Sequence, residues 1–402
     1  MSAPLNRQAM LILLLLFVGV FCNAMIVPFM GFFIVDGLGR DPWEISIYVG
    51  IVTTLSILVN RTFGGRFDKG AKVRPLVGIS VSAFLIATLT LSLYPTYWII
   101  IGFVSLCFSL SSGSTAIMYS FGRAYAAEQG LPATRYNSYL RTMTSLGWMF
   151  GPALSFAIAS QWGSQVVFIT AASLGILWLL AWALAIPKSF CVTPSPTINT
   201  LPTSHDHAFN KGLWLAVTAC FFFSIAHILT SSALPLFFTQ EAGLPTFTPG
   251  LSFTIKCLME VIAILIAPAL IQKFGVRITL YFAALIAMPT FYILSQVDTI
   301  AYLIIGSALE GLYYGIFAGV SITFVQSFAN GRMGRATSLY MNSLLLGGML
   351  GNLSMGLVAS SFSYKTAIQL SLISVACALV ILVLSRRSDR VVSNSLESQT
   401  RL

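Results

Sequence analysis

Twelve apolar segments dominate this chain, and each is long enough to form a membrane-crossing helix. About 20 apolar helical residues cross the hydrocarbon core of a bilayer, which is about 30 Å thick. With 57% hydrophobic and 8% charged residues, the 402-residue chain also has too little charge to cover a water-soluble protein of its size. The sequence therefore predicts an all-α membrane protein with twelve transmembrane helices.

A repeat within the chain predicts how these helices are organised. Residues 135–155 read RYNSYLRTMTSLGWMFGPALS, and residues 335–355, which lie 200 positions later, read RATSLYMNSLLLGGMLGNLSM. A second match, at an offset of 204, relates the ends of the second and eighth apolar segments at Lys69 and Lys273. Repetition at a fixed spacing indicates duplicated structure. The chain is therefore predicted to form two pseudo-symmetric six-helix bundles.

The predicted bundles occupy residues 1–186 and 212–385. Residues 187–211 lie between them, are rich in proline, serine and threonine and have no apolar period. Such a composition is typical of a flexible linker. The polar residues 386–402 are predicted to form a disordered tail.

The net charge of +10 comes mostly from short basic clusters between apolar segments. Basic loops mark the cytoplasmic side of a membrane protein. With the N-terminus inside, the basic cluster 61–74 is cytoplasmic, whereas only Arg40 and Lys365 lie on the opposite side. The pattern predicts a multi-pass inner (plasma) membrane protein with both termini in the cytoplasm. The excess of basic residues is therefore expected to set the orientation in the membrane and to contact membrane lipid, and it does not indicate nucleic-acid binding.

Enzyme motifs are absent from the sequence. It has no phosphate-binding loop, no metal-ligand spacing and no serine or cysteine nucleophile with a positioned base. The six cysteines are scattered without a close pair. We therefore expect neither an enzyme activity nor a cofactor or metal site.

Ionisable residues inside the predicted helices are the main functional candidates, because a charge in a membrane is costly unless it is paired or hydrated. Lys256 and Glu260 are four residues apart and share a helix face. They can form a structural ion pair, or Glu260 can load and release a proton. Glu310 is expected at a similar depth and competes for that role. Both glutamates are predicted proton-coupling residues.

Other polar and aromatic side chains near the expected midplane are predicted to line a substrate cavity. Arg141 is either a cavity cation or a side chain that extends to the membrane interface. His227 is either a packing residue or part of a proton path. The predicted cavity residues are Asn23, Arg141, Trp148, His227, Lys256, Tyr313, Tyr314 and Asn342.

Two short motifs resemble the major facilitator superfamily. The run Gly64-x-x-x-Asp68-Lys69 is similar to its cytoplasmic loop after the second helix, and GWMFGP at 147–152 resembles the Gly-Pro motif of its exporters. A basic membrane anchor and close helix packing with a proline bend are the structural alternatives. The resemblance implies gating roles for Asp68, Lys69, Gly147, Gly151 and Pro152.

Longer stretches resemble the bacterial sugar efflux transporter family. They are SFGRAYAAEQG, SYLRTMTSLGWMFGPALSF, LPLFFTQEAGLP with the Glu260 segment, and QSFANGRMGRATSLYMNS. Arg141 and Glu260 are the most informative matches, whereas Glu310 stands where the resemblance leads us to expect asparagine.

This resemblance implies a monomer of the major facilitator fold that exports sugars or related small polar solutes by proton-coupled alternating access. A multidrug exporter of amphiphiles is one alternative. The other is a non-transporting receptor or sensor built on a transporter scaffold.

Overall fold

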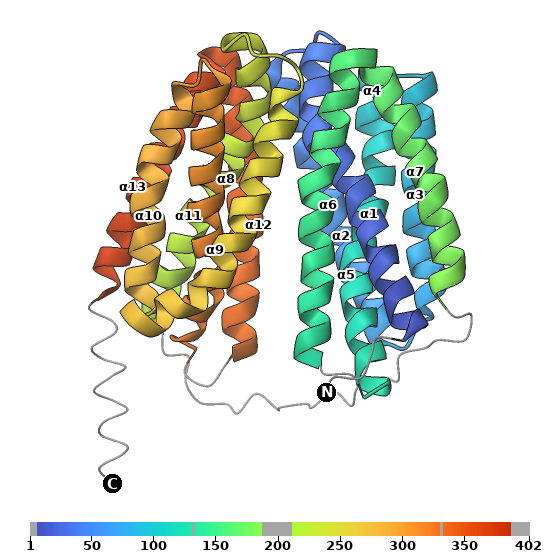
Figure 1. Ribbon diagram of the computed structural model, residues 1–402, viewed down its shortest axis with the longest axis horizontal. Coiled ribbons are helices and arrows are strands. Elements are labelled where there is room, and N and C mark those ends of the chain that lie inside the picture. Colours follow the sequence, from blue (N-terminus) through green and yellow to red (C-terminus); the bar gives the residue numbers. More distant parts are fainter. Residues whose placement is uncertain (1–5, 131–132, 187–210, 330–332, 387–402) are drawn as a thin grey trace. The chain divides into compact units, whose positions relative to one another are not determined.

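A computed structural model describes residues 6–130, 133–186, 211–329 and 333–386, and their regular elements are all helices (Figure 1). They form two compact units. The first holds α1–α7 together with Pro245–Thr254, and the second holds the remaining residues of α8–α13. The predicted linker and tail lie outside the described residues, apart from Lys211 and Arg386.

The first unit contains six long helical segments. Two π-helical turns occur in it: η1 (Phe33–Gly37) continues α1, and η2 (Ile100–Val104) joins α4 to α5. The α-helices are α1 (Arg7–Phe32), α2 (Pro42–Asp68), α3 (Val73–Leu93), α4 (Tyr97–Ile99), α5 (Ser105–Glu128), α6 (Ala133–Trp162) and α7 (Ser164–Ala185).

The second unit repeats this arrangement. A π-helical turn, η3 (Phe237–Glu241), continues its first helix at the position that corresponds to η1 at an offset of 204. The α-helices are α8 (Lys211–Leu236), α9 (Thr248–Phe274), α10 (Val276–Ser295), α11 (Ile300–Gln326), α12 (Met333–Ser361) and α13 (Tyr364–Leu384). The prediction of an all-α protein with six long helical segments in each half is confirmed.

Eleven helical segments in the described parts of the chain have the length and hydropathy to cross a membrane. The remaining long helix, α6, has 30 residues but is more polar in its first half, where Arg141, Thr142 and Thr144 lie. Arg141 is one of the predicted site residues. A polar stretch in a helix of spanning length therefore coincides with a functional candidate.

The repeated glycine pairs have the same packing role in both units. A Cβ atom on Gly151 of α6 would lie 2.7 Å from the backbone nitrogen of Met25 on α1. A Cβ atom on Gly351 of α12 would lie 2.8 Å from the backbone oxygen of Ile225 on α8. Small residues four apart allow such close helix contacts in membranes. The echo in the sequence therefore corresponds to equivalent helix pairs.

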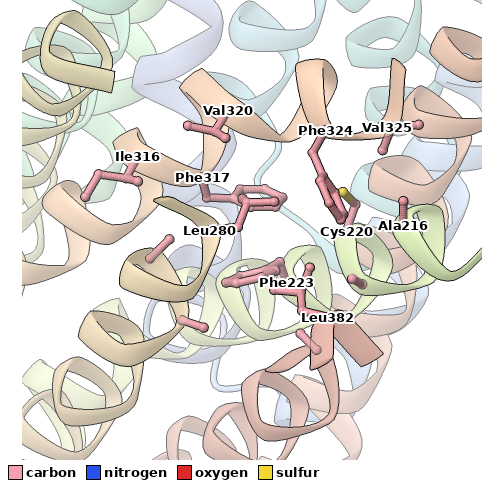
Figure 2. Packing of buried hydrophobic residues seen from close by; sticks show 14 of the residues in the cluster. Ala216, Cys220, Phe223, Leu280, Ile316, Phe317, Val320, Phe324, Val325 and Leu382 are labelled. Carbon is pink, nitrogen blue, oxygen red and sulfur yellow. The ribbon is translucent and has the colours of Figure 1, made fainter. Parts of the chain in front are cut away.

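Aromatic side chains fix α8 against α11 in the core of the second unit (Figure 2). Phe223 of α8 stacks on Phe317 of α11, with ring centroids 4.6 Å apart and an interplanar angle of 24°. Cys220 and Phe324 pack beside them, and Leu280 and Leu382 add contacts from α10 and α13. This core holds the two helices that carry most of the polar cluster described below.

An arginine caps the last helix of each unit. Arg74 donates from Nη1 to the carbonyl of Ile186 at 2.9 Å, after α7, and lies over the Trp182 ring. Arg277 donates from Nη1 to the carbonyl of Leu382 at 2.5 Å and to Ser385 Oγ at 2.6 Å, at the end of α13. Cations are favourable at helix C-termini, where carbonyl groups lack partners.

Arg277→Ala is expected to destabilise the protein by about 1.5–3 kcal/mol, because it removes charge-assisted hydrogen bonds to the end of α13. Thermal unfolding of the purified protein in detergent measures the change. Arg277→Lys, which keeps the charge but cannot bind two groups through a planar fork, should give an intermediate loss. An alanine variant as stable as the original protein would contradict the capping role.

Candidate functional site

A lysine and a glutamate form a buried ion pair inside the second unit. Lys256 on α9 places Nζ 2.9 Å from Oε1 of Glu310 on α11. Lys256 is 6% exposed and Glu310 is fully buried. Removing two charges from water is expensive, and a well-packed apolar pair is often as stable or more so. The pair is therefore a functional candidate and not simply a source of stability.

Glycines on α11 bring these two residues together. A Cβ atom on Gly311 would overlap the backbone oxygen of Lys256 and lie 2.8 Å from Cβ of Met259. A Cβ atom on Gly315 would lie 2.5 Å from the backbone oxygen of Glu260. The backbone of α11 therefore lies directly against α9. Sequence analysis missed this contact, although Gly311, Gly315 and Gly319 are spaced four residues apart, as in the glycine pairs that it did find.

Two side chains from α8 also contact the lysine. Ser231 accepts a hydrogen bond from Lys256 Nζ at 2.9 Å and donates one to Glu310 Oε1 at 3.4 Å. His227 places Nε2 3.4 Å from Lys256 Nζ. Ser231 was not among the predicted site residues. It lies in the short run SSAL at 231–234, inside an otherwise apolar segment.

Two tyrosines of α11 hold the histidine ring. Tyr314 stacks on His227 with ring centroids 3.5 Å apart and an interplanar angle of 8°. The Tyr313 hydroxyl lies 3.1 Å from His227 Nδ1. The structure thus places the predicted residues His227, Lys256, Glu310, Tyr313 and Tyr314 in one cluster.

One carboxylate oxygen in this cluster has an unused acceptor capacity. Oε2 of Glu310 is buried, and it has no hydrogen-bond partner among the described residues. Buried polar atoms are nearly always hydrogen-bonded, because an unsatisfied one carries its full desolvation cost. A donor supplied by a bound molecule would satisfy this oxygen.

Glu260 lies near the ion pair without joining it. Lys256 pairs with Glu310 and not with Glu260, although Lys256 and Glu260 are one turn apart on α9. The Glu260 side chain is half-buried, and its carboxylate forms no ion pair within the described part of the chain. The alternative of a closed Lys256–Glu260 pair is therefore not the arrangement in the structure.

Asn23 occupies the position in the first unit that corresponds to His227 at an offset of 204. Its side chain donates to the Gly19 carbonyl at 2.9 Å and accepts a hydrogen bond from Ser111 at 3.0 Å. This pair from α1 and α5 carries no charge. At this position the first unit therefore has an uncharged pair where the second has a histidine beside an ion pair.

The remaining predicted cavity residues lie outside the cluster. Arg141 is exposed and Trp148 is half-buried on α6 of the first unit, and Asn342 is exposed on α12 of the second. Their shared role in a cavity stays a prediction.

The predicted gating residues have differing surroundings. Asp68 is the last residue of α2, and its side chain lies outside the described part of the structure; Lys69 is exposed. Gly147 and Gly151 pack against α1, and Pro152 is buried within α6. The glycines thus have a packing role, and gating stays a prediction for all five.

Comparisons with known proteins identify the family. The Major Facilitator Superfamily model matches residues 12–258 and 216–401. The chain is 23% identical over 385 residues to sugar efflux transporter C of Escherichia coli (strain K12), covering 95% of this chain and 97% of that protein. It is 24% identical over 361 residues to sugar efflux transporter B of Salmonella typhimurium, covering 89% and 90% respectively.

A solved structure agrees with this assignment at the level of the fold. The crystal structure of nucleoside transporter NupG has a TM-score of 0.74 and 14% sequence identity, and the match covers 95% of this chain and 99% of that one. Since the family model covers nearly the whole chain and the helices match this fold, the protein belongs to the Major Facilitator Superfamily.

Proposed function

We propose that this protein is a secondary active transporter that exports sugars or related small polar solutes across the inner membrane in exchange for protons. Its superfamily membership supports transport, and the names of its relatives support sugars as the substrate class. The two six-helix units would open the path alternately to each side of the membrane, as in transporters built from repeated bundles.

The buried Lys256–Glu310 pair is the observation that carries this proposal. Its charges cancel, so it suits an uncharged polar solute better than an ion. Oε2 of Glu310 is an acceptor without a partner among the described residues, and a sugar hydroxyl is a suitable donor. In the proposed cycle the substrate hydrogen-bonds to Glu310. Asn23, Arg141, Trp148 and Asn342 would add contacts from their own helices.

Glu260 is the better candidate for carrying the proton. The carboxylate of Glu310 is already paired with the ammonium of Lys256 at 2.9 Å, so carrying a proton there would break a buried ion pair. Glu260 forms no ion pair among the described residues and is half-buried, so a proton can reach it when its side of the transporter opens. The proton would then bind on α9, one turn from Lys256, and the substrate would bind Glu310 on α11, so that the two compete through the shared charge of Lys256.

Transport by purified protein in proteoliposomes tests the proposal. With an imposed pH gradient, radiolabelled mono- and disaccharides are followed alongside one cationic dye. We expect sugar movement that stops when an uncoupler collapses the gradient. Dye movement without sugar movement would replace the proposal with drug export. Movement of neither would contradict sugar transport and favour a receptor or sensor.

Glu260→Gln is expected to abolish gradient-driven sugar transport, because glutamine keeps the size of the side chain but cannot bind and release a proton. Sugar exchange between equal concentrations, which needs no net proton movement, should persist. Glu128→Gln, at the exposed end of α5, is the matched control and should leave both modes unchanged. Full gradient-driven transport by the Glu260→Gln protein would contradict Glu260 as the proton-carrying residue and leave Glu310 as the candidate for that role.

A further inference from the structure

His227 has a geometry that the transport proposal does not use. We propose that it is a positioning residue: a neutral imidazole with its proton on Nδ1, which holds the Lys256 ammonium in place against Glu310. The effect on transport rests on the proposed function, whereas the protonation state of the ring is independent of it.

The hydrogen-bond partners fix the tautomer. A lysine ammonium has donors and no acceptor, so Nε2 of His227, 3.4 Å from Lys256 Nζ, can only accept. A neutral imidazole then carries its proton on Nδ1. That nitrogen lies 3.1 Å from the Tyr313 hydroxyl and 3.9 Å from Glu310 Oε1, both of which can accept a hydrogen bond.

A charged ring does not fit this site. An imidazolium would present an N–H group to the Lys256 ammonium and place a second positive charge beside it. His227 is only 6% exposed, so little water is present to screen that repulsion. The groups around it that can carry charge are Lys256 and, further along α9, Glu260, together with Glu310, Tyr313 and Tyr314 of α11.

The ring has little freedom to turn away. Face-to-face stacking on Tyr314 sets its plane, and the contact with Tyr313 sets its rotation. Because α8 and α11 are also joined by the stack of Phe223 on Phe317, the imidazole is carried by two packed helices. Nε2 is therefore a fixed acceptor for the lysine.

The neutral acceptors matter when the ion pair loosens. When a substrate engages Glu310, the attraction that holds Lys256 weakens. His227 and Ser231 still accept from the ammonium, so it stays in position for the pair to re-form. In the described part of the first unit, no cation is hydrogen-bonded to the corresponding pair, Asn23 and Ser111. This difference agrees with a role for His227 that is specific to the second unit, where the Lys256–Glu310 pair lies.

The tautomer can be observed directly, because the chain has only three histidines. Replacing His205 and His207 with asparagine leaves His227 as the sole site of ¹⁵N-histidine labelling. Solid-state NMR in lipid should then show a neutral ring at neutral pH, protonated at Nδ1 and bare at Nε2. An imidazolium, or a ring protonated at Nε2, would overturn the proposal whether or not the protein transports sugar.

Two substitutions separate positioning from packing. His227→Gln keeps an amide oxygen that can accept from Lys256, whereas His227→Phe keeps a ring for Tyr314 and has no acceptor. We expect the phenylalanine variant to raise the KM for sugar exchange about tenfold or more, since a hydrogen bond to a charged group is lost, and glutamine to recover most of it. The maximal rate per folded protein should change less.

Thr230→Val is the matched control for packing. Thr230 is buried on α8 and donates a hydrogen bond to Ser371 on α13 at 2.8 Å. This hydrogen bond does not involve the ion pair. Its loss should lower the thermal stability and leave KM unchanged. Equal effects of His227→Phe and His227→Gln on KM, or no effect of either, would contradict the positioning role. Absence of any sugar transport by the original protein would instead contradict the proposed function, and the NMR result would still stand.

Discussion

Lys256→Met is expected to destabilise the protein by about 3–5 kcal/mol and to abolish transport. Methionine has a similar length but no charge, so the fully buried carboxylate of Glu310 would lose its ammonium partner at 2.9 Å. A buried charge left alone in this way is strongly destabilising. Thermal unfolding in detergent and transport in proteoliposomes measure the two effects.

The double variant Lys256→Met with Glu310→Gln separates stability from function. With both charges removed, most of the stability should return, because replacing a buried pair by neutral side chains is often nearly neutral. Transport should stay absent. Lys273→Met, on the exposed last turn of the same helix, should have little effect. If Lys256→Met were as stable as Lys273→Met, the ion pair would not have the buried environment described above.

Gly311→Ala is expected to destabilise the protein by about 3 kcal/mol, at the upper end of the usual range for overpacking. The new methyl group would overlap the backbone oxygen of Lys256, and a backbone atom cannot turn aside as a side chain does. The two helices must separate, which lengthens the contact between Lys256 and Glu310. We therefore expect a higher KM for sugar as well as a lower unfolding temperature.

Gly50→Ala is the matched control for this substitution. Gly50 lies inside α2, and a Cβ atom there would meet nothing within 4 Å. Alanine is favoured over glycine inside a helix, so this variant should be at least as stable as the original protein. Equal effects of the two substitutions would contradict the close approach of α9 and α11.

The long-range part of the site was beyond sequence analysis. The length of the apolar segments and the internal repeat predicted two sets of six helices, because both can be read along the chain without knowing which helices touch. The spacing of Lys256 and Glu260 suggested a pair within one helix, because residue spacing predicts which side chains are close within a helix but not between helices. Which glutamate meets the lysine depends on the contact between α9 and α11. That contact is set by glycines on α11 and not by either charged residue.

The two units have also diverged in ways that a sequence repeat alone could not interpret. Pro152 of α6 corresponds to Asn352 of α12, and Pro28 of α1 corresponds to Ser232 of α8. Ser232 donates a hydrogen bond to Asn352 Oδ1 at 2.5 Å. The second unit thus joins two helices by a polar contact at positions where the first unit has prolines that disrupt helix hydrogen bonding.

Proton release on sugar binding is the most direct test of competition between proton and substrate. Purified protein in weakly buffered detergent solution is mixed with a transported sugar, and a pH indicator records protons released per sugar bound. The original protein should release protons, whereas Glu260→Gln should bind the sugar and release none. Sugar binding without proton release by the original protein, or unchanged release by Glu260→Gln, would contradict coupling through Glu260.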